Sequence, residues 1–288
     1  FEASVGGGIP IIRPISQCLA ANDVTEIAGI LNGTTNFILT KMIREQMNFE
    51  DALKLAQQLG YAERNPSADV EGLDACRKIC ILASLAFGTH VYPDSVYTEG
   101  ITKITLQDVD FADVWGGVIK LIGSVKKLEN GQVHIMVCPM FVHRGSQLAS
   151  VDDVFNGIMV RGDATGDVVF YGKGAGKLPT ASAVVADVVD ALKNGSKVHD
   201  SLFWQPAEPV DGMLTDPTPA AYYVRVAGIA PAVAEAIYGK GRVVDEHYEG
   251  CSYFVEQADE KALAEAARKV EAVGGSVKLW LKRLPEED

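Results

Sequence analysis

Three charged residues are spaced so that they could carry out acid–base chemistry together. In the stretch GYAERNPSADVEGLDACRKI, residues 60–79, Glu71, Asp74 and Lys78 stand at positions i, i+3 and i+7. On a helix these positions share one face, so a carboxylate and an amine lie one turn apart. The residues after Lys78 are apolar on nearly all sides, which places its amine at the edge of a core, partly desolvated, where it can exchange protons near neutral pH. The alternative is a solvated ion pair, since Asp–Lys pairs at this spacing contribute only about 0.3 kcal/mol.

The loop before this helix is acidic. Tyr61, Glu63 and Asp69 precede Asp74, and together they form a cluster suited to a ligand that carries an ammonium group. The competing explanation is that these side chains only solvate a surface loop.

Two glycine-rich segments can bring backbone close to a ligand. VGGGIP (5–10) precedes an apolar segment but is not a GxGxxG fingerprint, and GKGAGKLPTAS (172–182) presents backbone N–H groups and a helix N-terminus to an anion or a cofactor amide. For both segments a packed turn is the alternative. The five histidines show no metal-binding spacing, and Cys76 with Cys80 has no neighbouring His or Cys to complete a tetrahedral site.

Composition limits the partners of the chain. With 288 residues and 48% hydrophobic residues it can bury one large core plus a small second domain, and its net charge of -12 argues against nucleic acid or an anionic membrane as the main partner. An odd number of cysteines, five, the lack of a secretory segment at the start and the lack of about 18 consecutive apolar residues predict a cytoplasmic protein outside the membrane. A small-molecule substrate is the expectation.

Periodicity predicts an α+β fold. We expect a strand before an Asn32-Gly33 turn, a helix capped by Thr34 or Thr35, a helix that ends at Gly60, and a central helix after Gly72. Mixed helices and strands follow to about residue 200, including a helix over 181–192. Residues 204–219 are proline-rich and predict a linker, and the remainder reads as βαββαβ.

Four blocks in order carry a resemblance to a known family. FEASVGGGIPII, GILNGTTNFILTKM, GYAERNPSADVEGLDACRKICILASLAFG and GKGAGKLPTASAVVADVVD resemble the homoserine dehydrogenase family over about residues 1–200. The resemblance implies a mixed-sheet domain over 1–203 that binds substrate and dimerises. It also implies the NAD(P)-dependent interconversion of L-aspartate 4-semialdehyde and L-homoserine in the biosynthesis of threonine, methionine and isoleucine.

The resemblance assigns roles to residues of the acidic cluster. Lys78 matches the proton-transferring lysine, and Asp74 matches the carboxylate that helps to hold the substrate hydroxyl. Glu63 matches the residue that holds the substrate ammonium. Four further residues match the lining of the same pocket: Tyr61, Asp69, Gly33 and Thr34. This chain has Asn65 where the family usually has Asp, which removes one charge from the loop.

The resemblance also implies a cofactor and a cation. Gly174 and Gly176 match the segment that approaches NADP or NAD, whose main binding domain, an N-terminal Rossmann domain, we expect to be missing from these residues. Without that domain, the helix over 181–192 would expose an apolar face. A monovalent cation, sodium, is implied by the match of Glu2 and of the backbone carbonyls of Val5, Gly7 and Ile9.

The tail over 220–288 resembles an ACT domain, a ferredoxin-like βαββαβ module that binds amino acids. It implies an amino-acid effector, although GIAPA (228–232) replaces the usual Asp-x-Pro-Gly turn. We expect a homodimer or homotetramer. The alternative for the chain alone is a catalytically inert fragment that oligomerises and binds amino acids.

Overall fold

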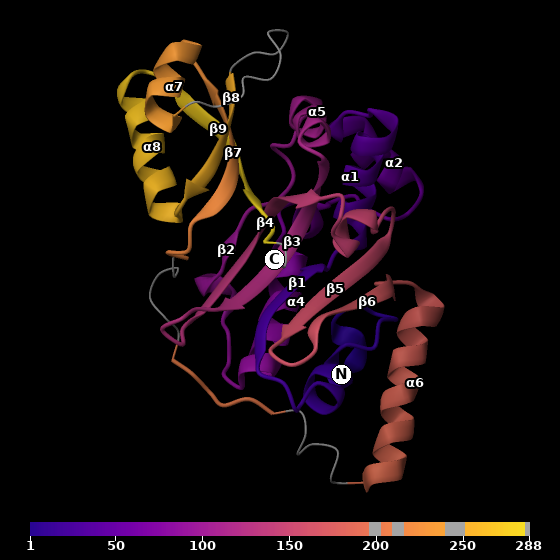
Figure 1. Cartoon of the computed structure of the whole chain (residues 1–288). Coiled ribbons are helices and arrows are strands. Elements are labelled where there is room, and N and C mark those ends of the chain that lie inside the picture. Colours follow the sequence, from indigo (N-terminus) through magenta and orange to yellow (C-terminus); the bar gives the residue numbers. More distant parts are fainter. Residues whose placement is uncertain (196–202, 209–215, 240–250, 286–288) are drawn as a thin grey trace.

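The computed structural model describes residues 1–195, 203–208, 216–239 and 251–285. Within these ranges nine strands form one mixed sheet in the order β6-β5-β1-β3-β4-β9-β7-β8, with the short β2 beside β4 (Figure 1). The predicted α+β class is confirmed. The strands are β1 (Val24–Ile30), β2 (Tyr97–Thr98), β3 (Gly117–Lys127), β4 (Val133–His143), β5 (Phe155–Gly162), β6 (Gly166–Lys173), β7 (Ala220–Ala227), β8 (Cys251–Ala258) and β9 (Ser276–Arg283). The helices are α1 (Gly33–Glu45), α2 (Phe49–Gln58), α3 (Ser67–Val70), α4 (Leu73–Phe87), α5 (Leu106–Val114), α6 (Lys177–Asn194), α7 (Pro231–Tyr238) and α8 (Glu260–Ala272).

The antiparallel hairpin of β3 and β4 forms the centre of the sheet. Its register runs without a shift from Gly117 opposite His143 to Lys127 opposite Val133. Alternate side chains of β3 enter two separate cores, as the strand period of two requires: Ile119 joins the larger cluster and Val118 the smaller one. Both faces of the hairpin are therefore covered, which makes it a rigid support for the helices around it.

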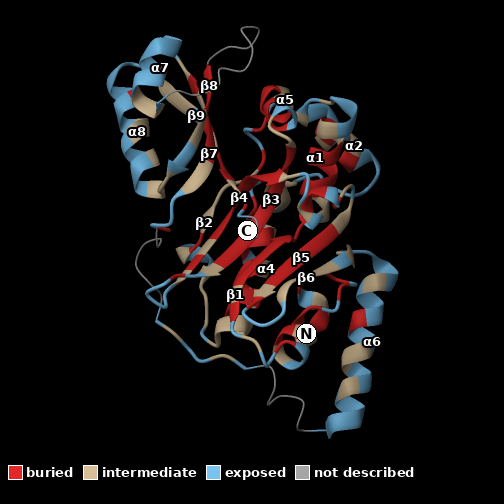
Figure 2. Ribbon diagram, in the orientation of Figure 1, coloured by how far each residue is buried: buried red, intermediate tan, exposed pale blue. Residues whose placement is uncertain are grey.

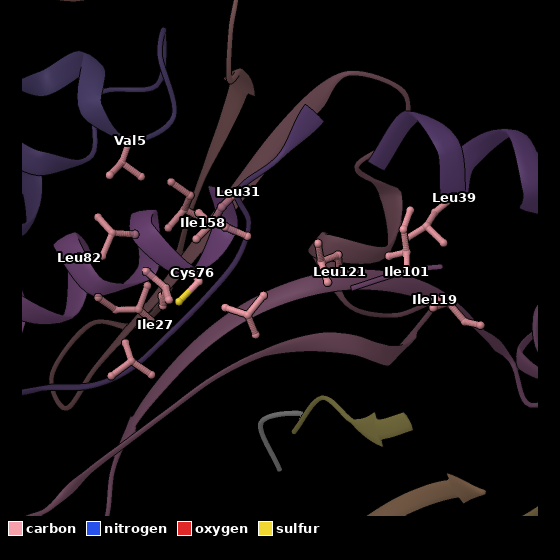
Figure 3. Close-up of a cluster of buried hydrophobic side chains, with 14 of the residues drawn as sticks. Val5, Ile27, Leu31, Leu39, Cys76, Leu82, Ile101, Ile119, Leu121 and Ile158 are labelled. Carbon is pink, nitrogen blue, oxygen red and sulfur yellow. The ribbon is translucent and has the colours of Figure 1, made fainter. Parts of the chain in front are cut away.

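Helix α4 packs on β1 and β3 and carries the predicted acid–base pair in its first two turns. Its apolar side chains, among them Cys76 and Leu82, lie in the larger core with Ile27 and Leu31 (Figure 3). Each fully buried Leu or Ile side chain stabilises the fold by about 1.5–3 kcal/mol, so this helix is fixed firmly. The prediction of a central helix after Gly72 is confirmed.

The start of α1 differs from the prediction. Neither Thr34 nor Thr35 caps the helix, because Asn32 holds the extended conformation of an N-cap and its side chain accepts a hydrogen bond from the backbone N–H of Thr35 at 2.9 Å. The helix therefore begins at Gly33, inside the predicted turn. The stop at the end of α2 is as expected, since Gly60 has φ +78 and follows the last helical residues.

The C-terminal part joins the main sheet directly. Strand β9 pairs in parallel with β4, with Met140 opposite Lys282, and pairs antiparallel with β7, which in turn pairs with β8. The described order of elements is β7-α7-β8-α8-β9, and the further strand expected near residues 242–249 lies outside the described residues. The domain boundaries and the ACT-like assignment stay predictions.

Helix α6 stands at the edge of the molecule and is mostly exposed (Figures 1 and 2). Its apolar side chains include Leu178, 78% exposed, and Leu192, 81% exposed, with Val184, Val185, Val188 and Val189 between them. The exposed apolar face predicted for this helix is confirmed. None of the helices in the described ranges has the length and hydropathy needed to span a membrane.

Gly100 lies against the backbone that leads into α4. A Cβ at this position would stand 1.9 Å from the carbonyl oxygen of Val70 and 2.4 Å from Cα of Glu71. We expect Gly100→Ala to lower the free energy of unfolding by about 2–3 kcal/mol, because the atoms that a methyl group would meet belong to the backbone of Val70 and Glu71, which cannot yield easily. Urea unfolding followed by circular dichroism measures the loss. Gly172→Ala is the control, since a Cβ there meets only the Ile9 side chain at 3.2 Å, and equal losses in the two variants would contradict the argument.

Candidate active site

The Asp74–Lys78 pair lies at the end of β1. The Lys78 amine donates hydrogen bonds to Asp74 Oδ2 at 2.6 Å and to the carbonyl oxygen of Leu31 at 2.9 Å. The Lys78 side chain is 21% exposed and that of Asp74 is 31% exposed. The pair is therefore not fully solvated. The Lys78 amine is hydrogen-bonded to α4 and to the residue after β1, and it keeps limited access to solvent.

Glu71 does not share this face, contrary to the spacing argument. Gly72 has φ +83 and separates α3 from α4, so Glu71 lies before the helix and is exposed. The sequence period applies only within a continuous helix, and the left-handed glycine interrupts it.

Asn32 is the site residue whose role the sequence did not reveal. Its Nδ2 donates to Asp69 Oδ1 at 2.7 Å and to Asp74 Oδ2 at 2.9 Å, while its Oδ1 accepts from the backbone and hydroxyl of Thr35. One buried carboxamide thus joins two carboxylates to the first turn of α1. The Asn-Gly dipeptide marked a turn, but spacing alone gave no sign of contacts 37 and 42 residues away.

The electrostatics of Asp69 follow from this arrangement. Burial raises the pKa of the Asp69 carboxyl above its usual range, and the nearby Asp74 carboxylate raises it further, against the hydrogen bond from Asn32 and the charge of Lys78. Two carboxylates that accept from the same Asn32 amide group create a local demand for positive charge.

The acidic loop lies against the first turn of α1. The hydroxyl of Thr34, which follows Gly33, donates to the carbonyl oxygen of Tyr61 at 2.7 Å, and the rings of Tyr61 and Phe37 are 5.0 Å apart. Glu63 is exposed, and its carboxylate has no hydrogen bond or ion pair among the described residues. This carboxylate is therefore available to a ligand.

The two glycine-rich segments pack on each other. Gly7 has φ +49, a Cβ there would lie 2.3 Å from the carbonyl oxygen of Gly174, and the N–H of Gly8 donates to the carbonyl of Lys173 at 3.0 Å. Gly176 starts α6 without a side-chain cap, which leaves backbone N–H groups of its first turn for a carboxamide or an anion. The two segments therefore form a packed turn, and their approach to a ligand stays a prediction.

The predicted cation ligands divide into two kinds. The buried Glu2 carboxylate accepts hydrogen bonds from the backbone N–H groups of Ile11, Ile12 and Arg13 at 2.7–3.1 Å, so it caps a helical turn. In the described chain no hydrogen-bond donor contacts the carbonyl oxygens of the other three residues, Val5, Gly7 and Ile9. Carbonyl oxygens suit a hard monovalent cation, so these three fit such a site better than the Glu2 carboxylate does.

Side-chain metal sites are not formed within the described ranges. No group of three or more His, Cys, Asp or Glu side chains there is arranged to hold a metal ion, and all five cysteines are free. Cys76 and Cys80 are buried in the core, in line with the interpretation that they act as small apolar side chains.

Fold and site together define an α+β domain in which a lysine–carboxylate pair on α4 is joined through Asn32 to Asp69. Residues 10–189 match the family model described as homoserine dehydrogenase. Relatives with that name include those of Synechocystis, 51% identical over 67% of this chain and 45% of the relative, and Pseudomonas aeruginosa, 44% identical over 78% and 53%. The solved homoserine dehydrogenase from Thiobacillus denitrificans superposes with a TM-score of 0.88 at 38% identity, covering 99% of this chain and 69% of that one. The chain belongs to the homoserine dehydrogenase family, and it spans about half the length of the curated relatives it matches.

Replacing Asp69 tests the electrostatics of the site. Because its pKa is raised, the folded chain binds this proton more readily than the unfolded chain, so stability is lost as the pH rises through the folded pKa. We expect Asp69→Asn to raise the melting temperature at neutral pH and to change it little near about pH 3, where both states are protonated. Thermal unfolding across this range measures the difference. A melting temperature lowered at neutral pH would show that the charge of Asp69 stabilises the fold.

Proposed function

We propose that the full-length protein is an NAD(P)-dependent homoserine dehydrogenase, which interconverts L-aspartate 4-semialdehyde and L-homoserine. The observation that carries the proposal is the Lys78 amine, held by Asp74 and the Leu31 carbonyl and linked through Asp74 and Asn32 to Asp69. The exposed Glu63 carboxylate, unpaired among the described residues, is free to bind a ligand. Membership of the family supports it, as does a neighbouring fold with 30% identity and a TM-score of 0.58, that of a hyperthermophilic archaeal homoserine dehydrogenase mutant in complex with NADPH.

The residues divide the work of binding and proton transfer. Glu63 binds the substrate ammonium by a charge-assisted hydrogen bond, and Asp69 and Tyr61 line the same side. Asp74 receives the hydroxyl end of the substrate and keeps the Lys78 amine aimed at it. In the reductive direction Lys78 donates a proton to the aldehyde oxygen as that oxygen becomes a hydroxyl, and in the oxidative direction it removes the hydroxyl proton.

The cofactor fits the second glycine-rich segment. Gly174 and Gly176 leave backbone accessible at the start of α6, as the approach of a nicotinamide carboxamide requires. When bound, NADP or NAD supplies or accepts the hydride. The carbonyls of Val5, Gly7 and Ile9 would hold a sodium ion close to the loop that contains Gly174, so this cation would stiffen the cofactor side of the site.

Regulation and assembly complete the proposal. The antiparallel order β9-β7-β8 is the order that a ferredoxin-like module requires of these strands, which supports an amino-acid effector at an ACT-like domain. We expect a cytoplasmic homodimer or homotetramer, and the five free thiols fit a reducing compartment.

Loss of the Lys78 amine should abolish most turnover. In the full-length protein we expect Lys78→Ala to lower kcat by about 10²–10⁴-fold, the usual contribution of a general acid–base group, with little change in the affinity for homoserine. NADPH formation with homoserine as substrate measures it. Lys103→Ala is the matched control, because the Lys103 side chain, 62% exposed, forms an ion pair of the same i,i+4 spacing with Glu99. Turnover near the wild-type value in Lys78→Ala would refute the assigned role.

Glu63→Gln should act on binding. Removing the charge that faces the ammonium is expected to raise the KM for homoserine by about 10-fold, with a smaller change in kcat, since a hydrogen bond to a charged group contributes about 1.5–3 kcal/mol. Steady-state kinetics give both constants. Glu50→Gln, another exposed glutamate, serves as the control. An unchanged KM in Glu63→Gln would remove Glu63 from the pocket.

A further inference from the structure

The substrate turn at Gly33 and the cofactor loop at Gly174 contact the same short segment, residues 154–156, the first at the Val154 backbone and the second at the Asn156 side chain. A Cβ at Gly33 would lie 2.8 Å from the carbonyl oxygen of Val154, and a Cβ at Gly174 would lie 2.2 Å from both Cγ and Nδ2 of Asn156. Both turns thus contact residues 154–156 without space for a methyl group. The position of this stretch sets the distance between the turns.

Asn156 is an unusual residue to find at this contact. It is 1% exposed, and its Oδ1 has no hydrogen-bond partner in the described chain. A buried polar atom without a partner destabilises the fold, whereas an aliphatic side chain of similar size would not. A flat carboxamide, however, allows the Gly174 backbone to approach more closely than a branched tetrahedral carbon would. The retained carboxamide therefore indicates a role in the position of the loop.

The stretch is fastened by side chains of α1, the helix that begins at the substrate turn. Nδ2 of Asn36 lies 3.0, 3.0 and 3.1 Å from the carbonyl oxygens of Val151, Asp153 and Phe155. The N–H of Asp153, whose φ is +53, donates to the Thr40 hydroxyl at 3.0 Å. Any displacement of residues 151–156 therefore strains these hydrogen bonds to α1.

A fully buried lysine completes the fastening from β3. Lys120 is 0% exposed, and its amine lies 2.5 Å from the Val151 carbonyl and 3.2 Å from both Asn36 Oδ1 and Asp152 Oδ1. Burying an ammonium is costly, and burial lowers the pKa of Lys120. The charge of Lys120 is not needed to neutralise Asp152, because the guanidinium of Arg44, 59% exposed, already pairs with that carboxylate at 2.9 Å. The role of the lysine lies in its hydrogen bonds to the loop.

We propose that residues 151–156, fastened by Lys120 and Asn36, form a brace that sets the spacing between the Gly33 turn and the Gly174 loop. Lys120 and Asn156 are then positioning residues for the transfer between cofactor and substrate. This inference rests on the proposed function. It also predicts a distinctive defect: each ligand still binds to its own turn, but the two are held at the wrong distance.

Lys120→Met in the full-length protein tests the brace, with Arg44→Met as the matched control on the same carboxylate. We expect kcat to fall by about 10- to 100-fold in Lys120→Met, because a displacement of about 1 Å has effects of this size. The Kd values for NADPH and for homoserine, from fluorescence titration of each alone, should stay within about twofold. The proposal would be overturned if Lys120→Met had the same kcat as Arg44→Met. It would also be overturned if the fall in activity of Lys120→Met were accompanied by weaker binding of NADPH or homoserine.

Asn156→Leu tests the other end of the brace and remains informative if Lys120→Met does not fold. We expect the same loss of kcat in a variant that still unfolds cooperatively, because the branched Leu side chain displaces the Gly174 loop. Unchanged kcat would overturn the proposal.

Hydrogen exchange gives a measurement that does not depend on catalysis. In Lys120→Met the amides of Gly33 and Gly174 should exchange together about 10-fold faster, and in Arg44→Met they should not. Unchanged exchange at both turns would overturn the brace. Turnover by the wild-type protein tests the proposed function separately, so the two ideas can fail independently.

Discussion

The site depends on one carboxamide, that of Asn32, which holds three separate segments together. Its two donors bind Asp69 from α3 and Asp74 from α4, and its oxygen caps α1. Because both carboxylates are fixed by the same group, Asp74 is oriented before any ligand arrives, and Lys78 is oriented through Asp74. The preorganisation needed for proton transfer thus comes from a neutral residue that does not itself exchange protons.

The parts of the molecule that follow from local sequence were predictable. The apolar period of α4 identified the central helix, and within it the pairing of Asp74 with Lys78 is a property of helical spacing. The same argument failed at Glu71, where one left-handed glycine ends the continuous helix. Resemblance to a family supplied the roles of the site residues, which spacing alone could not.

Other features depend on contacts between distant segments, to which local patterns are insensitive. Gly100 looks like any turn glycine in the sequence, yet a side chain at this position would collide with the backbone of Val70. Asn156 and Lys120 read as ordinary residues of β5 and β3. Their significance appears only from the contacts of residues 151–156 with Lys120, with the Gly33 turn and with the Gly174 loop. Predicting them requires the register of the sheet, which is set by the whole core.

The parallel pairing of β9 with β4 affects the order in which the protein can mature. One edge of the central hairpin contacts β2 at Met136 and Val137 and β9 at Met140 and Phe141. Until the last strand that the structure describes has left the ribosome, the second half of that edge keeps unpaired N–H and C=O groups. During synthesis the nascent chain therefore exposes an unpaired edge of β4. Early release of the chain, or truncation before β9, leaves this edge free to pair with strands of other chains.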